Sequence, residues 1–510
     1  MVPKKIILLV LTALLPLCVL AQEEWEVRHG GCLPTGLPQH SYANSSPLLS
    51  SRRLPAINDQ WDATRVYKQA VILIEFDELT DETSDDTKFS KENPAEYYDR
   101  LFNEPGFSER HSKGCVADYY REQSGGLLNL SFDVYGPITV HQKAQPYDAP
   151  DSNTHNYGRE SFIEAINNVI SANPDINWKQ YDWDDDGYVN QVIFVYAYYG
   201  GNNGVSTYGY IWPNTSSFSA ITAPDGTKIS NYSASAERWP TESVILCGLG
   251  TICHEFSHSL GLPDLYRTDI SDNVILDMWD LMDGGNFTNY GFCPPNYSPM
   301  EKILLGWKEA EELTEPTTVQ GMEYGKIYKI SKTDREYYLL ENRPQKGWDE
   351  GVPGKGLCIY HVEWYAAKWR SNTVNNGDVQ GYTLVHADGL DYYQWLGLLG
   401  GKTKFANTGM MNCLALSTTP FPYLPPEDDA VTSFEEVEGK PVTNIQFDVD
   451  GNISFDFMGG VSAIQPITHH LSPITTQYYD LRGCRVDEPV RGQLYLVRKA
   501  DGSISKAIYK

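Results

Sequence analysis

Hydrophobic positions follow two different periods over roughly the first 310 residues of the chain. A continuous apolar run or a strict alternation indicates a strand, and apolar residues three or four apart indicate an amphipathic helix. Strand patterns occupy residues 70–76, 129–134 and 191–199, and helical patterns occupy residues 95–102, 116–123 and 159–170. Because strands and helices alternate along this region, the sequence predicts an α/β or α+β domain over residues 66–310.

The pattern changes beyond Trp307, where helical spacing fades and short alternating strands separated by turn residues take over. These strand patterns lie at residues 326–330, 336–341, 356–363 and 452–457. They predict an all-β sandwich over residues 311–458. A linker is expected at 459–472, and residues 473–510 show the compact β pattern of a small C-terminal module.

The N-terminal residues have the features of a secretory signal. Lys4 and Lys5 precede an apolar run over residues 6–20, and the small Ala21 ends it. That run is shorter than the about 20 residues that span a bilayer, so we expect a signal peptide over residues 1–21, cleaved after about Ala21. Residues 22–65 are polar and aperiodic, which indicates an N-terminal extension or a short pro-segment. Its lone thiol, Cys32, could bind and block a metal site in a zymogen, form a disulfide or be idle.

Composition and charge narrow the range of partners. The formal charge of −27 would repel phosphate backbones, so we expect no nucleic-acid partner, and no later segment is apolar enough for a transmembrane anchor. Export to the outside of the cell or to the cell surface permits disulfides, but the irregular cysteine spacing does not determine any pairing. We expect a monomer.

The stretch with the most specific chemistry is His254-Glu255-x-x-His258-x-x-Gly261-x-x-Asp264. Two histidines four residues apart on a helix lie on one side of it, at a spacing that suits Zn²⁺, and the glutamate between them can activate a water. Gly261 can end the helix in a left-handed conformation and allow Asp264 to turn back to the same ion. A water or another carboxylate could instead complete the zinc shell.

The helix that carries this motif is predicted to begin near Thr241, a plausible N-cap. Its apolar face would then consist of Ile245, Leu249, Ile252, Phe256 and Leu260. His254 and His258 fall roughly opposite that face, so one side of the helix can pack on a core while the other lines a cleft.

An acidic stretch precedes the strand at residues 191–199. Asp182, Asp184 and Asp186 alternate along it and Gly187 follows, as in calcium-binding loops. An EF-hand would have a glutamate at the twelfth position, where this chain has Ile193, so the stretch is not an EF-hand. Two interpretations stay open, namely a Ca²⁺ site and a solvated acidic turn.

Together these motifs, with the methionine-containing turn at residues 278–285, resemble the metzincin clan of zinc peptidases and, within it, the M6 or immune inhibitor A-like family. The resemblance implies zinc held by His254, His258 and Asp264, Glu255 as the general base, and Met282 as an apolar floor beneath the metal. It implies a metzincin-like catalytic domain with a central active-site helix. Residues 473–510 resemble the sorting domain of type IX-secreted proteins.

We therefore expect a secreted zinc-dependent endopeptidase that cleaves internal peptide bonds of extracellular proteins, with a zinc-bound water activated by Glu255. The expected cofactors are Zn²⁺ and, under one interpretation, Ca²⁺. Two alternatives remain. The chain could be a surface-binding or adhesion protein with a vestigial zinc domain, or a zinc hydrolase acting on a non-peptide amide.

Overall fold

The computed structural model divides the chain into two compact units, residues 1–460 and 461–510, and describes only part of each. The predicted signal peptide, Cys32 and Thr241 lie outside the described residues. The described residues are 61–78, 87–143, 157–203, 210–239, 244–269, 275–352, 354–387, 432–448, 450–461, 477–479, 485–486, 490–498 and 504–508.

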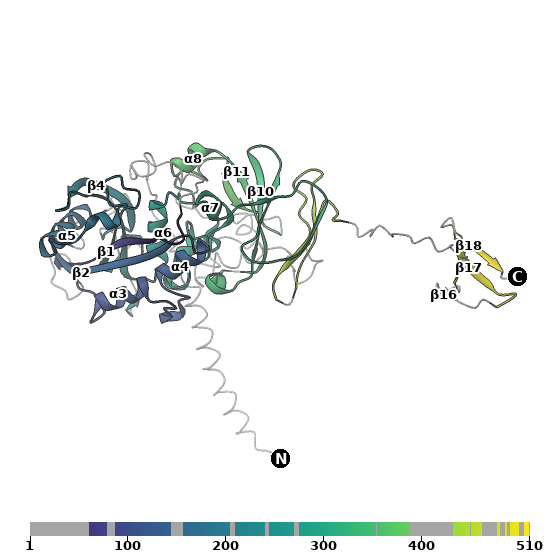
Figure 1. Ribbon diagram of the computed structural model, residues 1–510, viewed down its shortest axis with the longest axis horizontal. Coiled ribbons are helices and arrows are strands. Elements are labelled where there is room, and N and C mark those ends of the chain that lie inside the picture. Colours follow the sequence, from purple (N-terminus) through teal and green to yellow (C-terminus); the bar gives the residue numbers. More distant parts are fainter. Residues whose placement is uncertain are drawn as a thin grey trace, which may run out of the picture. The chain divides into compact units, whose positions relative to one another are not determined.

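A twisted six-stranded sheet forms the first half of the larger unit (Figure 1). Its strands are β1 (Val66–Glu78), β2 (Asn129–Lys143), β3 (Val192–Tyr199), β4 (Asn214–Thr222), β5 (Lys228–Trp239) and the short β6 (Ile245–Leu246). The order is β2-β1-β3-β5-β4, and β6 also pairs with β5. β2, β1, β3 and β5 are parallel, whereas β4 runs antiparallel to β5.

Both faces of this sheet are buried, as the continuous apolar run of β1 predicts. Val71 and Leu73 point into one core, which also contains side chains of α3 (Pro94–Asn103), α4 (Val116–Gln123) and α6 (Gly250–Ser259). Ile72 and Ile74 point into a second core against α5 (Arg159–Ala172). The period of two along β1 thus places helices on both sides of the sheet, as Figure 1 shows.

The sequence accounts for the ends of the helices on the α6 side. Pro94 occupies the first turn of α3, where its missing N–H costs nothing. α4 begins with a capping box in which Cys115 Sγ accepts from Asp118 N and Cys115 N donates to Asp118 Oδ2. The two helices pack tyrosines and phenylalanines into the core that also holds α6.

The predicted start of the motif helix was wrong. Residues near 245 form strand β6, and α6 begins only at Gly250. The cause is close packing, because a Cβ atom on Gly248 or Gly250 would lie 2.3 Å from Gly291 C or 2.0 Å from Asn286 O. The two glycines allow the chain to pass against the loop at 286–291. The predicted end was right, since Gly261 has φ +102°.

Two further sheets follow in residues 311–457, which we call the β-rich region. The five-stranded sheet has the order β12-β11-β10-β9-β7, and the three-stranded sheet has the order β13-β14-β8. Their apolar faces share a third core. The strands are β7 (Glu311–Glu312), β8 (Thr317–Met322), β9 (Ile327–Ser331), β10 (Glu336–Arg343), β11 (Gly356–Glu363), β12 (Tyr382–Leu384), β13 (Val442–Phe447) and β14 (Ile453–Phe457).

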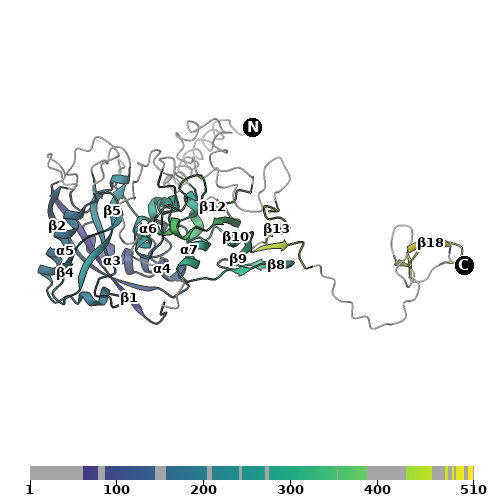
Figure 2. The ribbon, with the colours of Figure 1, turned by 90° about the horizontal axis from the view of Figure 1, so that it is seen from above.

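Two short helices contribute side chains to the core around the motif helix. They are α7 (Pro299–Leu304) and α8 (Ala366–Arg370). The core around α6 also contains Leu339 and Tyr360 from the five-stranded sheet, so one core continues past residue 310. In both Figure 1 and Figure 2, α6 lies between the six-stranded sheet and the β-rich region.

One buried ion pair joins α7 to β10, and a second joins β10 to the turn at Gly347–Gly351. Lys302 Nζ is 2.9 Å from Glu341 Oε1, and Arg343 Nε donates to Asp349 Oδ2 at 2.8 Å. All four side chains are buried. Buried charges are costly unless they are paired and hydrogen-bonded, so the Lys302–Glu341 pair fixes how β10 packs against α7.

The smaller unit is a four-stranded antiparallel sheet with the order β16-β15-β17-β18. Its strands are β15 (Gln477–Tyr479), β16 (Arg485–Val486), β17 (Leu494–Arg498) and β18 (Ile504–Ile508). In the part of the chain that the structure describes, no helix has the length and apolar character needed to cross a membrane.

The five cysteines among the described residues are all free and buried. They are Cys115, Cys247, Cys253, Cys293 and Cys358. Burial raises the pKa of the Cys247 thiol above its usual range, which is typical of thiols that pack as small apolar groups.

Candidate metal centre

One helix and the loop after it bring three potential metal ligands together. His254 and His258 lie one turn apart on α6, and Asp264 lies five residues beyond the last helical residue, Ser259. Asp264 Oδ1 is 3.2 Å from His254 Nε2 and 3.2 Å from His258 Nε2. All three side chains are buried, and their ligand atoms converge on one point.

The hydrogen bonds of the two histidines fix which nitrogen faces that point. His254 Nδ1 lies 2.9 Å from Leu281 O, and His258 Nδ1 lies 2.8 Å from Leu262 O. A carbonyl oxygen can only accept, so each Nδ1 carries the proton and each neutral ring has its lone pair on Nε2. Backbone carbonyls in this position orient metal-binding histidines and strengthen them as ligands.

This arrangement leaves lone pairs facing one another. Neither His258 Nε2 nor Asp264 Oδ1 has a hydrogen-bond partner among the described residues, although both are buried. Two acceptors 3.2 Å apart repel unless a proton or a cation lies between them. Two ligand atoms that each lie about 2.1 Å from a tetrahedral ion are about 3.4 Å apart. The donor set and its spacing therefore fit Zn²⁺.

The pKa shifts of the metal-free protein reflect the same close contact. Burial opposes charge on both groups, but the attraction between them prevails. It raises the pKa of His258 to about 9 and, together with His254, holds the pKa of Asp264 well below its usual range.

Glu255 lies next to His254 in sequence and is held by a residue of the six-stranded sheet. Thr215 Oγ1, on β4, is 2.9 Å from Glu255 Oε2 and 2.6 Å from Glu255 O. Burial raises the pKa of Glu255, and the neighbouring histidines act against that rise. A carboxyl with a raised pKa is suited to accept a proton near neutral pH.

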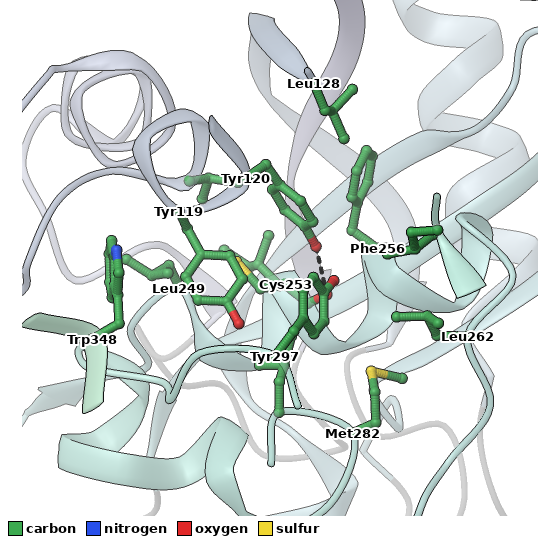
Figure 3. Close-up of a cluster of buried hydrophobic side chains, with 14 of the residues drawn as sticks. Tyr119, Tyr120, Leu128, Leu249, Cys253, Phe256, Leu262, Met282, Tyr297 and Trp348 are labelled. Carbon is green, nitrogen blue, oxygen red and sulfur yellow. Dashed lines mark hydrogen bonds between the residues drawn. The ribbon is translucent and has the colours of Figure 1, made fainter. Parts of the chain in front are cut away.

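Met282 lies in a turn whose backbone supports the metal-binding loop. Leu265 N donates to Met282 O at 2.9 Å, and Met282 N donates to Asp280 Oδ1 at 2.7 Å. The Met282 side chain is fully buried and belongs to the core around α6. Figure 3 shows it beside Leu262, which precedes Asp264 by two residues.

Aromatic residues cover the opposite side of α6. Tyr120 OH donates to Cys253 O at 2.8 Å, and its ring packs edge-on against Phe256 at 5.0 Å between centroids. Tyr297 lies close to both Tyr120 and Ser257 (Figure 3). This packing fixes the position of the helix that carries the two histidines.

The acidic turn has a different character. Asp182, Asp184 and Asp186 each offer one oxygen within 4.8 Å of the others, as their alternation predicts. Asp182 is buried and accepts from Asp186 N at 3.2 Å and from Gly187 N at 2.9 Å, whereas the side chains of Asp184 and Asp186 are exposed. The turn is thus folded by backbone hydrogen bonds, and both interpretations of it stay open.

A third group of possible ligands lies on neighbouring strands of the β-rich region. Glu336, His361 and Glu363 share one face of β10 and β11. Glu336 Oε1 lies 3.1 Å from His361 Nε2 and also accepts from Lys332 Nζ at 2.7 Å. Because Lys332 already supplies a cation there, we assign no metal to this group. His361 is not part of the zinc group, which consists of His254, His258 and Asp264.

Two residues that support the metal centre could not be predicted from the sequence. Thr215 holds Glu255, and Asn372 contacts Asp264 from 108 positions further along the chain. Neither belongs to a recognisable motif, and hydrophobic periodicity carries no information on such polar pairs. Only the packing of β4 and of the segment after α8 reveals them.

A helix with two histidines and a glutamate, followed by a buried aspartate, is a site of the metal-dependent hydrolase class. Residues 58–305 match the family described as “Immune inhibitor A peptidase M6, catalytic domain”. This match agrees with the family that the motifs resemble. It supports a metalloendopeptidase domain over these residues, with a metal, usually zinc, as its cofactor.

Two curated relatives extend this finding. Pre-pro-metalloprotease PrtV of Vibrio cholerae serotype O1 is 25% identical over an alignment of 277 residues, and the match covers 47% of this chain and 30% of the relative. Immune inhibitor A of Bacillus thuringiensis subsp. alesti is 27% identical over an alignment of 337 residues, and the match covers 58% of this chain and 48% of the relative. The chain thus spans less than half the length of either relative.

Proposed function

We propose that the chain is a zinc-dependent endopeptidase that hydrolyses internal peptide bonds of extracellular proteins. The observation that carries the proposal is the convergence of His254 Nε2, His258 Nε2 and Asp264 Oδ1 on one point, next to the buried Glu255. Three ligands leave a fourth position for water or substrate, which distinguishes catalytic from structural zinc sites.

When bound by His254, His258 and Asp264, zinc would supply Lewis-acid chemistry to the reaction. Glu255 would accept the proton of the attacking water and later deliver it to the leaving nitrogen. Thr215 supports this role by keeping the Glu255 carboxylate in place. The buried Tyr120 and Tyr297 pack behind the helix and take no part in proton transfer.

Strand β4 offers a place for the substrate backbone. It stands at the end of the strand order and pairs, among the described strands, only with β5. Thr215 brings its first residues against Glu255. An extended peptide that adds to the outer edge of β4 would pass the metal centre, as peptides do in β-augmentation.

Several finer expectations belong to the same proposal. Met282 forms the apolar floor of a metzincin-type site, a role that its burial and the Leu265–Met282 hydrogen bond support. The acidic turn binds Ca²⁺ through Asp182, Asp184 and Asp186. We place the catalytic domain at 66–310 and the β-sandwich at 311–458, and the shared core means that the two would fold together.

Localisation and assembly are also proposals. A signal peptide over residues 1–21 leads to secretion or display at the cell surface. The module at 473–510 serves as a type IX sorting domain, a role that its compact four-stranded sheet supports. Protein or peptide substrates are the expected partners, and we propose a monomer.

The test compares the purified protein with its Glu255→Gln variant. We expect the unmodified protein to cleave casein in a chelator-sensitive manner, and the variant to lose about 10²–10⁴-fold in rate while binding one zinc ion. Cleavage by the variant at the normal rate would refute the role of Glu255. An intact zinc site without cleavage of any protein in a substrate library would favour the adhesion alternative or a non-peptide amide substrate.

A further inference from the structure

We propose that Asn372 is a positioning residue of the metal centre, which holds the Asp264 carboxylate so that a single oxygen, Oδ1, faces the ion. Asn372 lies beyond the end of the matched catalytic domain at residue 305, so the β-rich region completes the site. This inference rests on the proposed zinc-peptidase function.

Two reciprocal hydrogen bonds join Asn372 to Asp264. Asp264 N donates to Asn372 Oδ1 at 2.6 Å, and Asn372 Nδ2 donates to Asp264 Oδ2 at 2.6 Å. The backbone N–H can only donate, so it fixes the orientation of the amide and directs the NH₂ group at the carboxylate. Both residues are buried, which limits competition from water.

This pairing divides the work between the two oxygens of Asp264. Oδ2 accepts from Asn372, whereas Oδ1 lies 3.2 Å from both histidine nitrogens and has no hydrogen-bond partner among the described residues. A carboxylate fixed in this way presents one oxygen to an ion without having to order its side chain on binding. Asn372 therefore acts on the metal only through Asp264.

The rest of the segment after α8 fastens the same loop. Asn375 Nδ2 donates to Leu265 O at 2.6 Å. Asn376 Oδ1 accepts from Thr268 N, and Asn376 Nδ2 donates to Thr268 Oγ1, both at 2.8 Å. Gly377 N donates to Asp269 Oδ2 at 3.0 Å. Residues 372–377 thus form a strap over residues 264–269, and only Asn372 in this strap contacts a proposed ligand.

The Asn376–Thr268 pair provides a matched control. It resembles the Asn372–Asp264 pair in its two reciprocal hydrogen bonds and connects the same two segments, but it contacts no proposed ligand. If Asn372 merely fastened the loop, removal of either side chain would have the same effect. If Asn372 positions the ligand, only its removal alters the metal.

The test uses Asn372→Gly and Asn376→Ala in the full-length protein. Asn372 has φ +57°, a left-handed conformation that glycine adopts without strain, so the glycine variant removes the amide alone. If Asn372→Gly does not fold, Asn372→Asp replaces it, because aspartate tolerates the left-handed conformation and still accepts from Asp264 N but cannot donate to Asp264 Oδ2.

Zinc affinity is measured by titration of metal-free protein against a competing chelator, and Co²⁺-loaded protein gives the visible spectrum of the ligand set. We expect Asn372→Gly to weaken zinc binding about 10–100-fold and to change the cobalt spectrum. Asn376→Ala should change the zinc affinity by less than about threefold and leave the cobalt spectrum unchanged. Equal affinities and spectra in the two variants would overturn the inference.

Failure of this inference can be told apart from failure of the proposed function. If the unmodified protein takes up no zinc, or if a His258→Ala variant keeps full zinc affinity, the proposed metal site itself is wrong. If zinc binding depends on His258 but not on Asn372, the site stands and only the positioning role falls.

Discussion

The zinc group and the acidic turn each bring three potential ligand atoms within 4.8 Å, yet the two sites are built differently. In the zinc group, the backbone carbonyls and Asn372 occupy the other atoms of each side chain, and the ligand atoms themselves remain available. In the acidic turn, the buried Asp182 uses both its oxygens to accept backbone N–H groups.

This difference teaches that the surroundings of a ligand atom matter more than its distance to the next one. A site prepared for a metal satisfies every polar atom except those that bind it, because an ion then replaces no existing bond. A turn whose carboxylate already caps the backbone can fold without a cation, and an ion adds to its stability. The predictions below test this contrast.

The largest effect is expected at the zinc group. The free energy of zinc binding at structural sites with four ligands is about 10–16 kcal/mol. Loss of one ligand should therefore weaken zinc binding by roughly 3 kcal/mol, or about 10²-fold in affinity. We predict this loss for His258→Ala, together with loss of protein cleavage. The measurement is zinc content after dialysis against a weak chelator. Full zinc retention would show that the three atoms do not form one site.

In the acidic turn, loss of the buried carboxylate should lower stability even without a bound ion, because that carboxylate holds the backbone of the turn. We predict that Asp182→Ala lowers the stability of calcium-free protein by about 1–3 kcal/mol, since Asp186 N and Gly187 N lose their acceptor. Asp184→Asn should leave calcium-free stability within about 0.5 kcal/mol. Thermal unfolding of zinc-loaded protein, with and without Ca²⁺, gives both values.

Calcium then separates the two interpretations of the turn. Under the calcium proposal, 1 mM Ca²⁺ stabilises the unmodified protein by mass action and stabilises Asp184→Asn much less. If Ca²⁺ shifts the unfolding of both proteins equally, the turn is a solvated acidic turn. If Asp182→Ala proves neutral without calcium, the contrast between the two sites is wrong.

The contrast also explains what could be predicted from the sequence. Ligand residues occur in short motifs, so His254, His258 and the acidic turn could be found from spacing alone, and β1, α3, α4 and α5 followed from hydrophobic period. The residues that prepare the site could not be found. Thr215 and Asn372 reach α6 and its loop from other parts of the chain, and their separations in sequence carry no signal.

The start of the motif helix was missed for a related reason. Residues 245–260 have apolar spacing that fits a helix, but a long-range contact decides the local structure. Gly248 and Gly250 allow backbone atoms of residues 286–291 to approach closely. Residues 245–246 therefore pair with β5, and the chain turns before α6 begins. Local propensity yielded to tertiary packing.

A smaller effect is expected where the zinc group meets the six-stranded sheet. We predict that Thr215→Val lowers kcat/KM roughly 10-fold, because the Glu255 carboxylate loses a hydrogen bond of about 1.5 kcal/mol. Zinc affinity should not change, since Thr215 contacts no proposed ligand, and Thr215→Ser should retain cleavage. A drop in zinc affinity of the valine variant would mean that β4 supports the metal as well.

The smallest effect is expected at the third group, Glu336, His361 and Glu363. Its ligand atoms also lie within 4.8 Å of one another, but Lys332 forms an ion pair with Glu336 and holds the pKa of Glu336 below its usual range. We predict that His361→Ala leaves the zinc stoichiometry at one, keeps cleavage unchanged and shifts stability by less than about 0.5 kcal/mol. Metal analysis and thermal unfolding of the variant measure these values. A second zinc ion that binds the unmodified protein but not His361→Ala would show that a nearby lysine does not exclude a metal. Ligand atoms that already have protein partners could then still bind an ion, against the contrast between the zinc group and the other two groups.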